Sequence, residues 1–103
     1  MLTGKQRSYL KSLAHHEKPI TQIGKGGISD AFVEQLDLAL EARELVKISV
    51  LETSLLDAKE TANELCEKLH AEFVQAIGNR FVLFRQSRKN PQIQLPKEVK
   101  AKK

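Results

Sequence analysis

Three glycines and a lysine occur together at Gly24-Lys25-Gly26-Gly27, between a short apolar run and a segment with helical periodicity. Residues without side chains allow a phosphate group to approach the main chain closely, and a lysine supplies positive charge. The segment therefore suggests a phosphate-binding loop. Three interpretations are open: a nucleotide cofactor, a nucleic-acid backbone, or a turn that binds nothing.

Two nucleotide-binding motifs fit this loop poorly. A Walker A loop has its lysine directly after the last glycine, whereas Lys25 precedes Gly26. A dinucleotide-binding fingerprint has a third glycine or alanine at the position of Ser29. The acidic residue that would bind the ribose would have to be Glu44 or Glu52, and Glu44 falls near the end of the expected helix. We therefore expect no nucleotide cofactor.

A nucleic-acid backbone fits the loop better. A G-x-x-G segment such as Gly24–Gly27 can clamp a run of nucleotides through its main chain. Ser29 is a suitable N-cap for the helix that follows, and the free N–H groups of its first turn would add donors for phosphate oxygens. Lys25 would project from the loop as a mobile charge. The alternative is a strand-to-helix turn whose glycines serve packing alone.

Basic residues are unevenly distributed along the chain. Residues 1–29 hold five basic residues and one acidic residue, residues 30–79 hold four and eleven, and residues 80–103 hold eight and one. A polyanion would be attracted to the two ends and repelled from the middle. Solvation of a helix flank or of a strand edge is the alternative role for these basic residues. The candidate nucleic-acid contacts are Gly24, Lys25, Gly26, Gly27, Ser29, Arg7, Lys11, Lys18, Arg80, Arg85 and Arg88.

The remaining reactive side chains do not form a catalytic or metal-binding pattern. His15 and His16 are adjacent, so on a helix they point about 100° apart. Cys66 falls on an apolar helical stripe, which predicts a core position. Since no nucleophile–base pair or carboxylate pair can be argued from spacing, we expect no enzyme, no catalytic residue, no metal and no small-molecule substrate.

Capping residues and apolar periodicity predict the elements that position the loop. Thr3 with Gln6, and Asp57 with Glu60, have the spacing of a capping box. Helices are expected at residues 4–16, 30–44 and 58–71, and strands at residues 20–23, 45–51, 73–77 and 81–84. In helix 30–44, the acidic residues Glu34, Asp37, Glu41 and Glu44 fall outside the apolar arc, and Leu38 also does not fit the arc.

The order α-β-α-β-α-β-β predicts a single compact α/β domain with a mixed four-stranded sheet packed by three helices. Each strand-helix-strand unit should pair its strands in parallel, and a tight hairpin at Gly78-Asn79-Arg80 should add an antiparallel strand. The run 81–84 is apolar at every position, so that strand should be covered on both faces.

Four segments carry a family resemblance: LTGKQRSYLKSLAH at residues 2–15, PITQIGKGGIS at 19–29, ARELVKISV at 42–50 and IGNRFVLFR at 77–85. With them the chain resembles a stand-alone CRM domain of the YhbY family, which are small bacterial RNA-binding proteins associated with ribosome maturation. The resemblance implies a fold similar to the C-terminal domain of bacterial translation initiation factor three. It also implies that the G-x-x-G loop contacts RNA and that the partner is a precursor of the large ribosomal subunit.

Two functional hypotheses follow. The first is an RNA-binding domain at residues 1–96, followed by a basic, mobile tail at residues 97–103. The second is an adaptor that uses the acidic helices 30–44 and 58–71 to bind a basic protein, with Leu38 as its clue. Only one cysteine and no apolar stretch of about 18 residues occur, so we expect a cytoplasmic protein without a membrane segment. We also expect a monomer.

Overall fold

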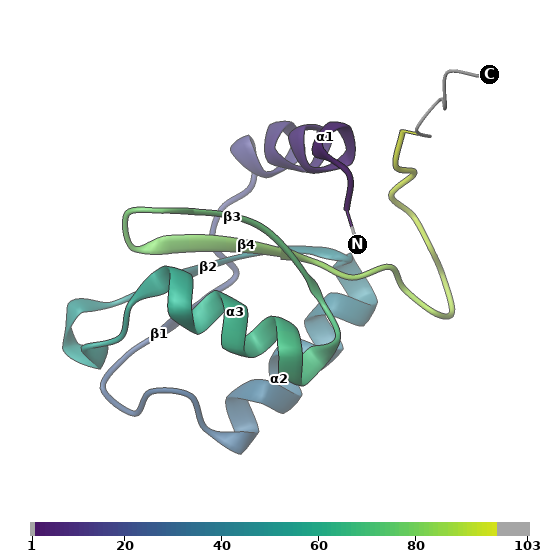
Figure 1. Ribbon diagram of the computed structural model, residues 1–103. Coiled ribbons are helices and arrows are strands. Elements are labelled where there is room, and N and C mark those ends of the chain that lie inside the picture. Colours follow the sequence, from purple (N-terminus) through teal and green to yellow (C-terminus); the bar gives the residue numbers. More distant parts are fainter. Residues whose placement is uncertain (1, 97–103) are drawn as a thin grey trace.

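The computed structural model describes residues 2–96, and the expected mobile tail at 97–103 lies outside them. Within the described residues, the order α-β-α-β-α-β-β is confirmed, with one short 3-10 helix added (Figure 1). The elements are α1 (Gly4–His15), β1 (Thr21–Ile23), α2 (Asp30–Arg43), β2 (Leu45–Val50), η1 (Glu52–Ser54), α3 (Ala58–Leu69), β3 (Glu72–Ile77) and β4 (Arg80–Phe84). None of these helices is long and apolar enough to cross a bilayer.

Each of the three α-helices begins after a polar residue that caps it. The side-chain oxygens of Thr3, Ser29 and Asp57 accept hydrogen bonds from the backbone N–H three residues later, at 3.0–3.1 Å. At α1 the side chain of Gln6 also accepts from the backbone N–H of Thr3, which completes the predicted capping box. These contacts satisfy N–H groups that would otherwise lack a partner, so helix starts are fixed locally.

The sheet has the strand order β1-β2-β4-β3. The predicted parallel pairing of β1 with β2 is confirmed, but the predicted pairing of β2 with β3 is wrong, because β4 lies between them and is antiparallel to both. The two-residue hairpin at Gly78 and Asn79 returns the chain beside β3. The apolar run 81–84 gains from an inner place in the sheet, beside β2, where both of its faces are covered.

Helices cover the two faces of the sheet unequally. Figure 1 shows α1 on one face and α2 with α3 on the other. From β4, Phe81 and Leu83 belong to the core beneath α2 and α3, whereas Val82 and Phe84 belong to a second core with α1. The prediction that β4 is covered on both faces is therefore confirmed.

The C-terminal segment is held by two glutamates at the end of α2. Glu44 was expected outside the apolar arc, but it is only 1% exposed, because the backbone after Arg43 turns with a positive φ of 67° and directs its carboxylate inward. That carboxylate accepts hydrogen bonds from the backbone N–H groups of Ser87, Gln92 and Ile93 at 2.7–2.8 Å. Burial of Glu44 opposes its ionisation, but these three donors outweigh it and lower the pKa.

Candidate nucleic-acid interface

The glycine segment forms a tight turn between β1 and α2. The backbone N–H of Gly27 donates to the carbonyl oxygen of Gly24 at 2.9 Å, so Lys25 and Gly26 are the two central residues of the turn and both are exposed. Gly27 has a φ of +66°, a conformation that costs an L-residue about 1–2 kcal/mol. The backbone conformation therefore explains why residue 27 is a glycine.

Gly26 has no comparable reason to be a glycine. Its φ lies outside the left-handed region, and a Cβ placed on it would meet no atom within 4 Å. A Cβ on Gly24 would make only an ordinary contact with Leu51 Cδ1 at 3.6 Å. Backbone conformation thus requires a glycine at only one of the three positions. At the exposed tip of the turn, a main chain without a side chain lets a ligand approach closely.

The loop lies at the same end of the sheet as the β3–β4 hairpin. The backbone N–H of Leu51 donates to Ile23 at 2.8 Å, and that of Val50 donates to Asn79 at 2.6 Å. The strand ends therefore align, and Gln22, Ser49, Arg80 and Ile77 stand side by side across the four strands. Arg80 and the loop, which are far apart in the sequence, belong to one end of the molecule.

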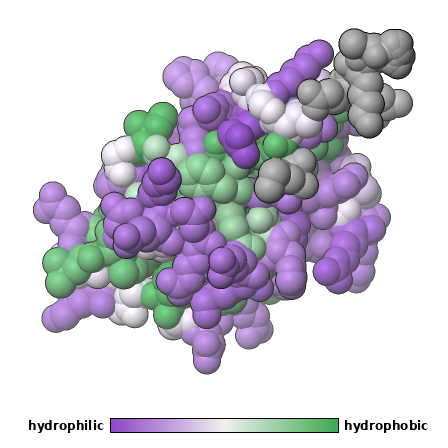
Figure 2. All heavy atoms as spheres, viewed as in Figure 1, coloured by the Kyte–Doolittle hydropathy of each residue, from purple (hydrophilic) through white to green (hydrophobic). Residues whose placement is uncertain are grey.

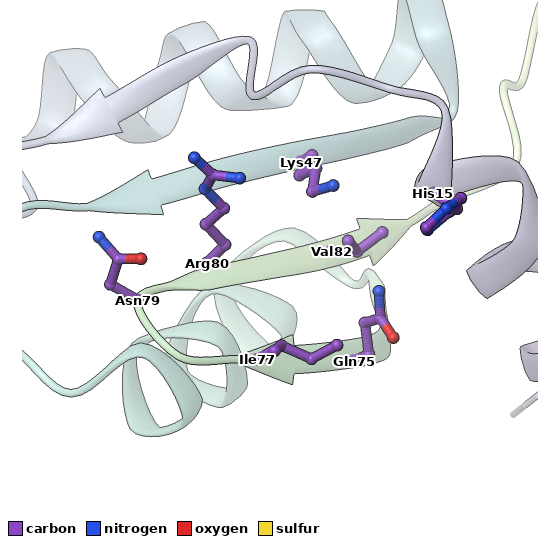
Figure 3. A pocket seen from close by; sticks show the side chains of 7 residues that line it. All are labelled: His15, Lys47, Gln75, Ile77, Asn79, Arg80 and Val82. Carbon is purple, nitrogen blue, oxygen red and sulfur yellow. The ribbon is translucent and has the colours of Figure 1, made fainter.

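The sheet face beneath α1 is open toward this end. Helix α1 packs through Leu10 and Ala14 over the end of the face at which Leu45 and Phe84 lie. Beyond it is a hollow of about 280 Å³, lined from α1, β2, the hairpin, β3 and β4 (Figure 3). Lys47 borders this hollow, and its Nζ donates to the carbonyl oxygens of Ala14 and Glu17 at 3.3 Å. Lys18 is exposed in the connection that follows Glu17.

A second groove runs along the edge strand β3. Its volume is about 530 Å³, and it is bordered by Arg7 and Lys11 of α1 and by Lys59 of α3. The Nε of Arg7 donates to the carbonyl oxygen of Phe73 at 3.3 Å, which fixes the guanidinium beside the strand. The groove and the hollow share Gln75 and Ile77, so they form one continuous surface. We call the loop, the hollow and this groove together the basic surface.

Sequence reasoning missed Lys47 and Lys59 as members of the basic surface. Both lie in the segment 30–79, where acidic residues dominate, so the charge of the segment concealed them. Lys47 alternates with the buried residues Val46 and Ile48 of β2, and this alternation could have placed it on the opposite sheet face. The position of Lys59 beside Arg7 depends on how α3 packs, for which the sequence has no signal.

Two predicted contacts lie away from the basic surface. Arg85 forms an ion pair with Asp37 at 2.7 Å and donates to the carbonyl oxygens of Asp37 and Leu69 at 2.9 and 3.0 Å. Arg88 belongs to the segment that Glu41 holds through the backbone N–H groups of Arg88 and Lys89. Ser29 is exposed beside the loop, where its hydroxyl caps α2 as predicted.

The opposite side of the molecule is acidic. Helices α2 and α3 expose Glu34, Asp37, Glu60, Glu64 and Glu67. Leu38 is 64% exposed on α2, in agreement with its position outside the apolar arc. Figure 2 shows a largely hydrophilic surface over these helices, with hydrophobic atoms at the end that carries η1 and the hairpin and across the middle of the view. Acidic side chains therefore outnumber basic ones on the exposed surface of α2 and α3, although Arg43, Lys59 and Lys68 are exposed there too.

Reactive groups elsewhere in the described residues offer no competing site. Burial raises the pKa of the Cys66 thiol to about 11, with a smaller contribution from Glu72, so the thiol stays protonated at neutral pH. Residues 2–96 contain no cluster of three or more His, Cys, Asp or Glu side chains that could hold a metal ion.

A four-stranded mixed sheet with one helix on one face and two on the other, and a basic glycine turn at its end, defines a class of small α/β domains. The profile of the CRS1 / YhbY (CRM) domain matches residues 2–85. The chain belongs to this family.

Individual relatives agree along the length of the chain. The chain is 49% identical over 96 residues to "Probable RNA-binding protein YqeI" of Bacillus subtilis, covering 93% of this chain and all of the relative. It is 33% identical over 97 residues to "RNA-binding protein" of Haemophilus influenzae, covering 94% and 97%. The solution structure of the hypothetical protein SAV1595 from Staphylococcus aureus is 51% identical and superposes with a TM-score of 0.77, covering 93% of this chain and all of the other.

Proposed function

We propose that this protein binds RNA through the basic surface, and that its RNA is ribosomal RNA in a precursor of the large subunit. The observation that carries the proposal is the position of Lys25, Gly26 and Arg80 at one end of the sheet, with acidic residues concentrated on the far side. Its relatives named as RNA-binding proteins support the class of partner. The family resemblance supports the choice of ribosomal RNA.

The chemistry of the loop suits a phosphodiester backbone. Phosphate oxygens accept hydrogen bonds from main-chain N–H groups, and Gly26 leaves room for them to come close. The positive end of the α2 dipole lies beside the turn and favours a negative group there. Lys25 then acts as a flexible point charge at the exposed tip. Recognition in this arrangement depends on RNA shape and backbone more than on base sequence.

Arg7, Lys11, Lys47, Lys59 and Arg80 extend the proposed contact area away from the loop. We do not include Arg85, because its guanidinium already pairs with Asp37 and with two carbonyl oxygens. In this proposal the protein acts in the cytoplasm as a monomer and catalyses no reaction. A basic surface of this size retains RNA by charge and releases it as salt rises.

A protein-binding adaptor is the second candidate. The exposed Leu38 on the acidic helix α2 is the observation that favours it, because an exposed leucine among carboxylates could meet a basic partner. Sedimentation of a cell lysate through a sucrose gradient in low salt distinguishes the RNA-binding proposal from the adaptor. Migration of the protein with large-subunit precursors supports the RNA proposal, whereas a protein that stays at the top of the gradient argues against it.

A double variant tests the loop directly. Lys25→Asp/Gly26→Asp reverses the charge of the turn and adds a side chain that blocks access of phosphate to its main chain. Binding to a ribosomal RNA fragment should therefore be lost, and the melting temperature should be unchanged. Lys68→Asp/Asn63→Asp makes the same charge change at exposed positions of α3 and should bind nearly as the wild type does. Unchanged affinity in the folded loop variant would exclude the loop from the interface.

Salt dependence provides an independent measurement of phosphate contacts. The logarithm of the binding constant should fall linearly with the logarithm of the salt concentration, by a slope of about −0.7 for each single-strand phosphate neutralised. Lys25→Ala and Arg80→Ala should each make the slope shallower by about 0.7, and Lys68→Ala should leave it unchanged. Equal slopes for all three variants would contradict phosphate contacts at Lys25 and Arg80.

A further inference from the structure

We propose that the hollow beside Arg80 receives one unpaired base of the bound RNA. The proposal rests on the proposed function, and it adds a second mode of contact to the backbone contacts of the loop. Figure 3 shows side chains from β2, β3, β4 and the hairpin standing around the open part of the sheet, with His15 at the side where α1 ends.

The size and the apolar part of the lining of the hollow suit one ring system. Val82, which is almost fully buried, contributes to the sheet surface at the hollow, and Ile77 stands beside it on the edge strand. Ile77 is 68% exposed, so its side chain offers apolar surface to a ring that enters the hollow. The volume of about 280 Å³ is near the lower limit of the ~300–1,000 Å³ typical of ligand pockets. This favours a single ring system over a larger molecule.

The polar groups around the hollow suit the edges of a base. Gln75 and Asn79 each carry an amide that offers both donors and an acceptor, as the Watson–Crick edge of a base does. Arg80 adds a guanidinium that can stack on a ring or bind a phosphate. No carboxylate is among the described residues that line the hollow, so nothing there repels a nucleotide.

The neighbouring groove favours RNA over a free small molecule. It meets the hollow at Gln75 and Ile77 and carries Arg7, Lys11 and Lys59 along its length. A strand that laid its phosphates against these cations would pass the hollow and could turn one base into it. A base in a paired helix is stacked on both sides and cannot enter, so the protein should prefer RNA with an unpaired nucleotide.

Two RNA hairpins that differ by one nucleotide test this preference. The first has a fully paired stem, and the second has the same stem with a single bulged 2-aminopurine. We expect the wild type to bind the bulged stem about tenfold more tightly by anisotropy, since each base stacked on a protein contributes measurably to affinity. The fluorescence of the 2-aminopurine should also change on binding.

Variants of residues that line the hollow test whether the hollow causes the preference for the bulged stem. Ile77→Ala and Gln75→Ala should reduce the preference to less than about threefold, because stacking and edge contacts with the base are lost while the cations beside the groove are unchanged. Leu38→Ala is the matched control, since Leu38 is 64% exposed on the opposite side of the sheet. It should retain the full preference.

The outcomes separate this inference from the proposed function. Equal affinity of the wild type for both stems would overturn the base-binding hollow and leave RNA binding intact. A loss of preference in Leu38→Ala as large as in Ile77→Ala would also overturn it. Failure of the wild type to bind either stem or a ribosomal RNA fragment at low salt would instead overturn the proposed function.

Discussion

The guanidinium of Arg85 lies 2.7 Å from Oδ1 of Asp37 and connects the end of β4 to α2. The same group donates to the carbonyl oxygens of Asp37 and Leu69, so one side chain joins β4 to both helices of the acidic side. Arg80, at the other end of β4, is exposed beside the hollow. Two arginines that look equivalent in the sequence thus have different surroundings.

These surroundings predict opposite effects of alanine. Arg85→Ala should lower the free energy of unfolding by about 1–2 kcal/mol, because hydrogen bonds from a charged donor are lost and Asp37 is half-exposed, which limits the ion pair. It should leave RNA affinity nearly unchanged. Arg80→Ala should weaken RNA binding with little effect on stability. Urea unfolding and anisotropy on both variants test this, and a reversed pattern would contradict the assignment of both residues.

The glycine turn yields a second contrast. Gly26→Ala has space and an ordinary φ, so it should keep stability or raise it by about 0.4–1 kcal/mol through the unfolded state. It should weaken RNA binding nonetheless, because a Cβ would stand where phosphate approaches. Gly27→Ala must adopt a φ of +66° and should lose about 1–2 kcal/mol. Thermal melts paired with binding curves measure both effects, and full affinity of Gly26→Ala would argue against main-chain contact at the tip.

The glutamates that hold the C-terminal segment should make stability depend on pH. The pKa values of Glu41 and Glu44 are lowered from an ordinary value of 4.5, for Glu41 chiefly by the hydroxyl of Ser87 and by backbone N–H groups. A lowered folded-state pKa means that the stabilisation is present above about pH 4.5 and is lost as pH falls through the folded-state values. The melting temperature should therefore fall on acidification below that pH.

Glu44→Gln isolates this contribution. The amide is neutral at every pH, so the variant should be less stable than the wild type at pH 7, and the difference should shrink as the pH falls below about 4.5. Glu34→Gln changes an exposed glutamate of the same helix and is the control. A difference between wild type and Glu44→Gln that stays constant from pH 7 to pH 3 would contradict the role of the Glu44 carboxylate.

The sequence by itself determined the helices, the hairpin and the turn. Thr3, Ser29 and Asp57 act on N–H groups three residues away, and Gly78 and Asn79 form the two-residue hairpin loop, so each signal lies within a few residues of the element it starts or ends. Apolar alternation also placed Val46, Ile48 and Val50 on the buried side of β2. Such local interactions are readable from neighbouring residues alone.

Only the tertiary structure decided the partners of residues far apart in the chain. Glu44 bonds to groups 43 to 49 residues away, and Arg85 bonds to Asp37 across 48 residues. The inner place of β4 likewise depends on which strands gain most from two covered faces, a comparison among all four strands. Lys47 and Lys59 joined the basic surface for the same reason, because packing across the sheet brought them beside α1 and β3.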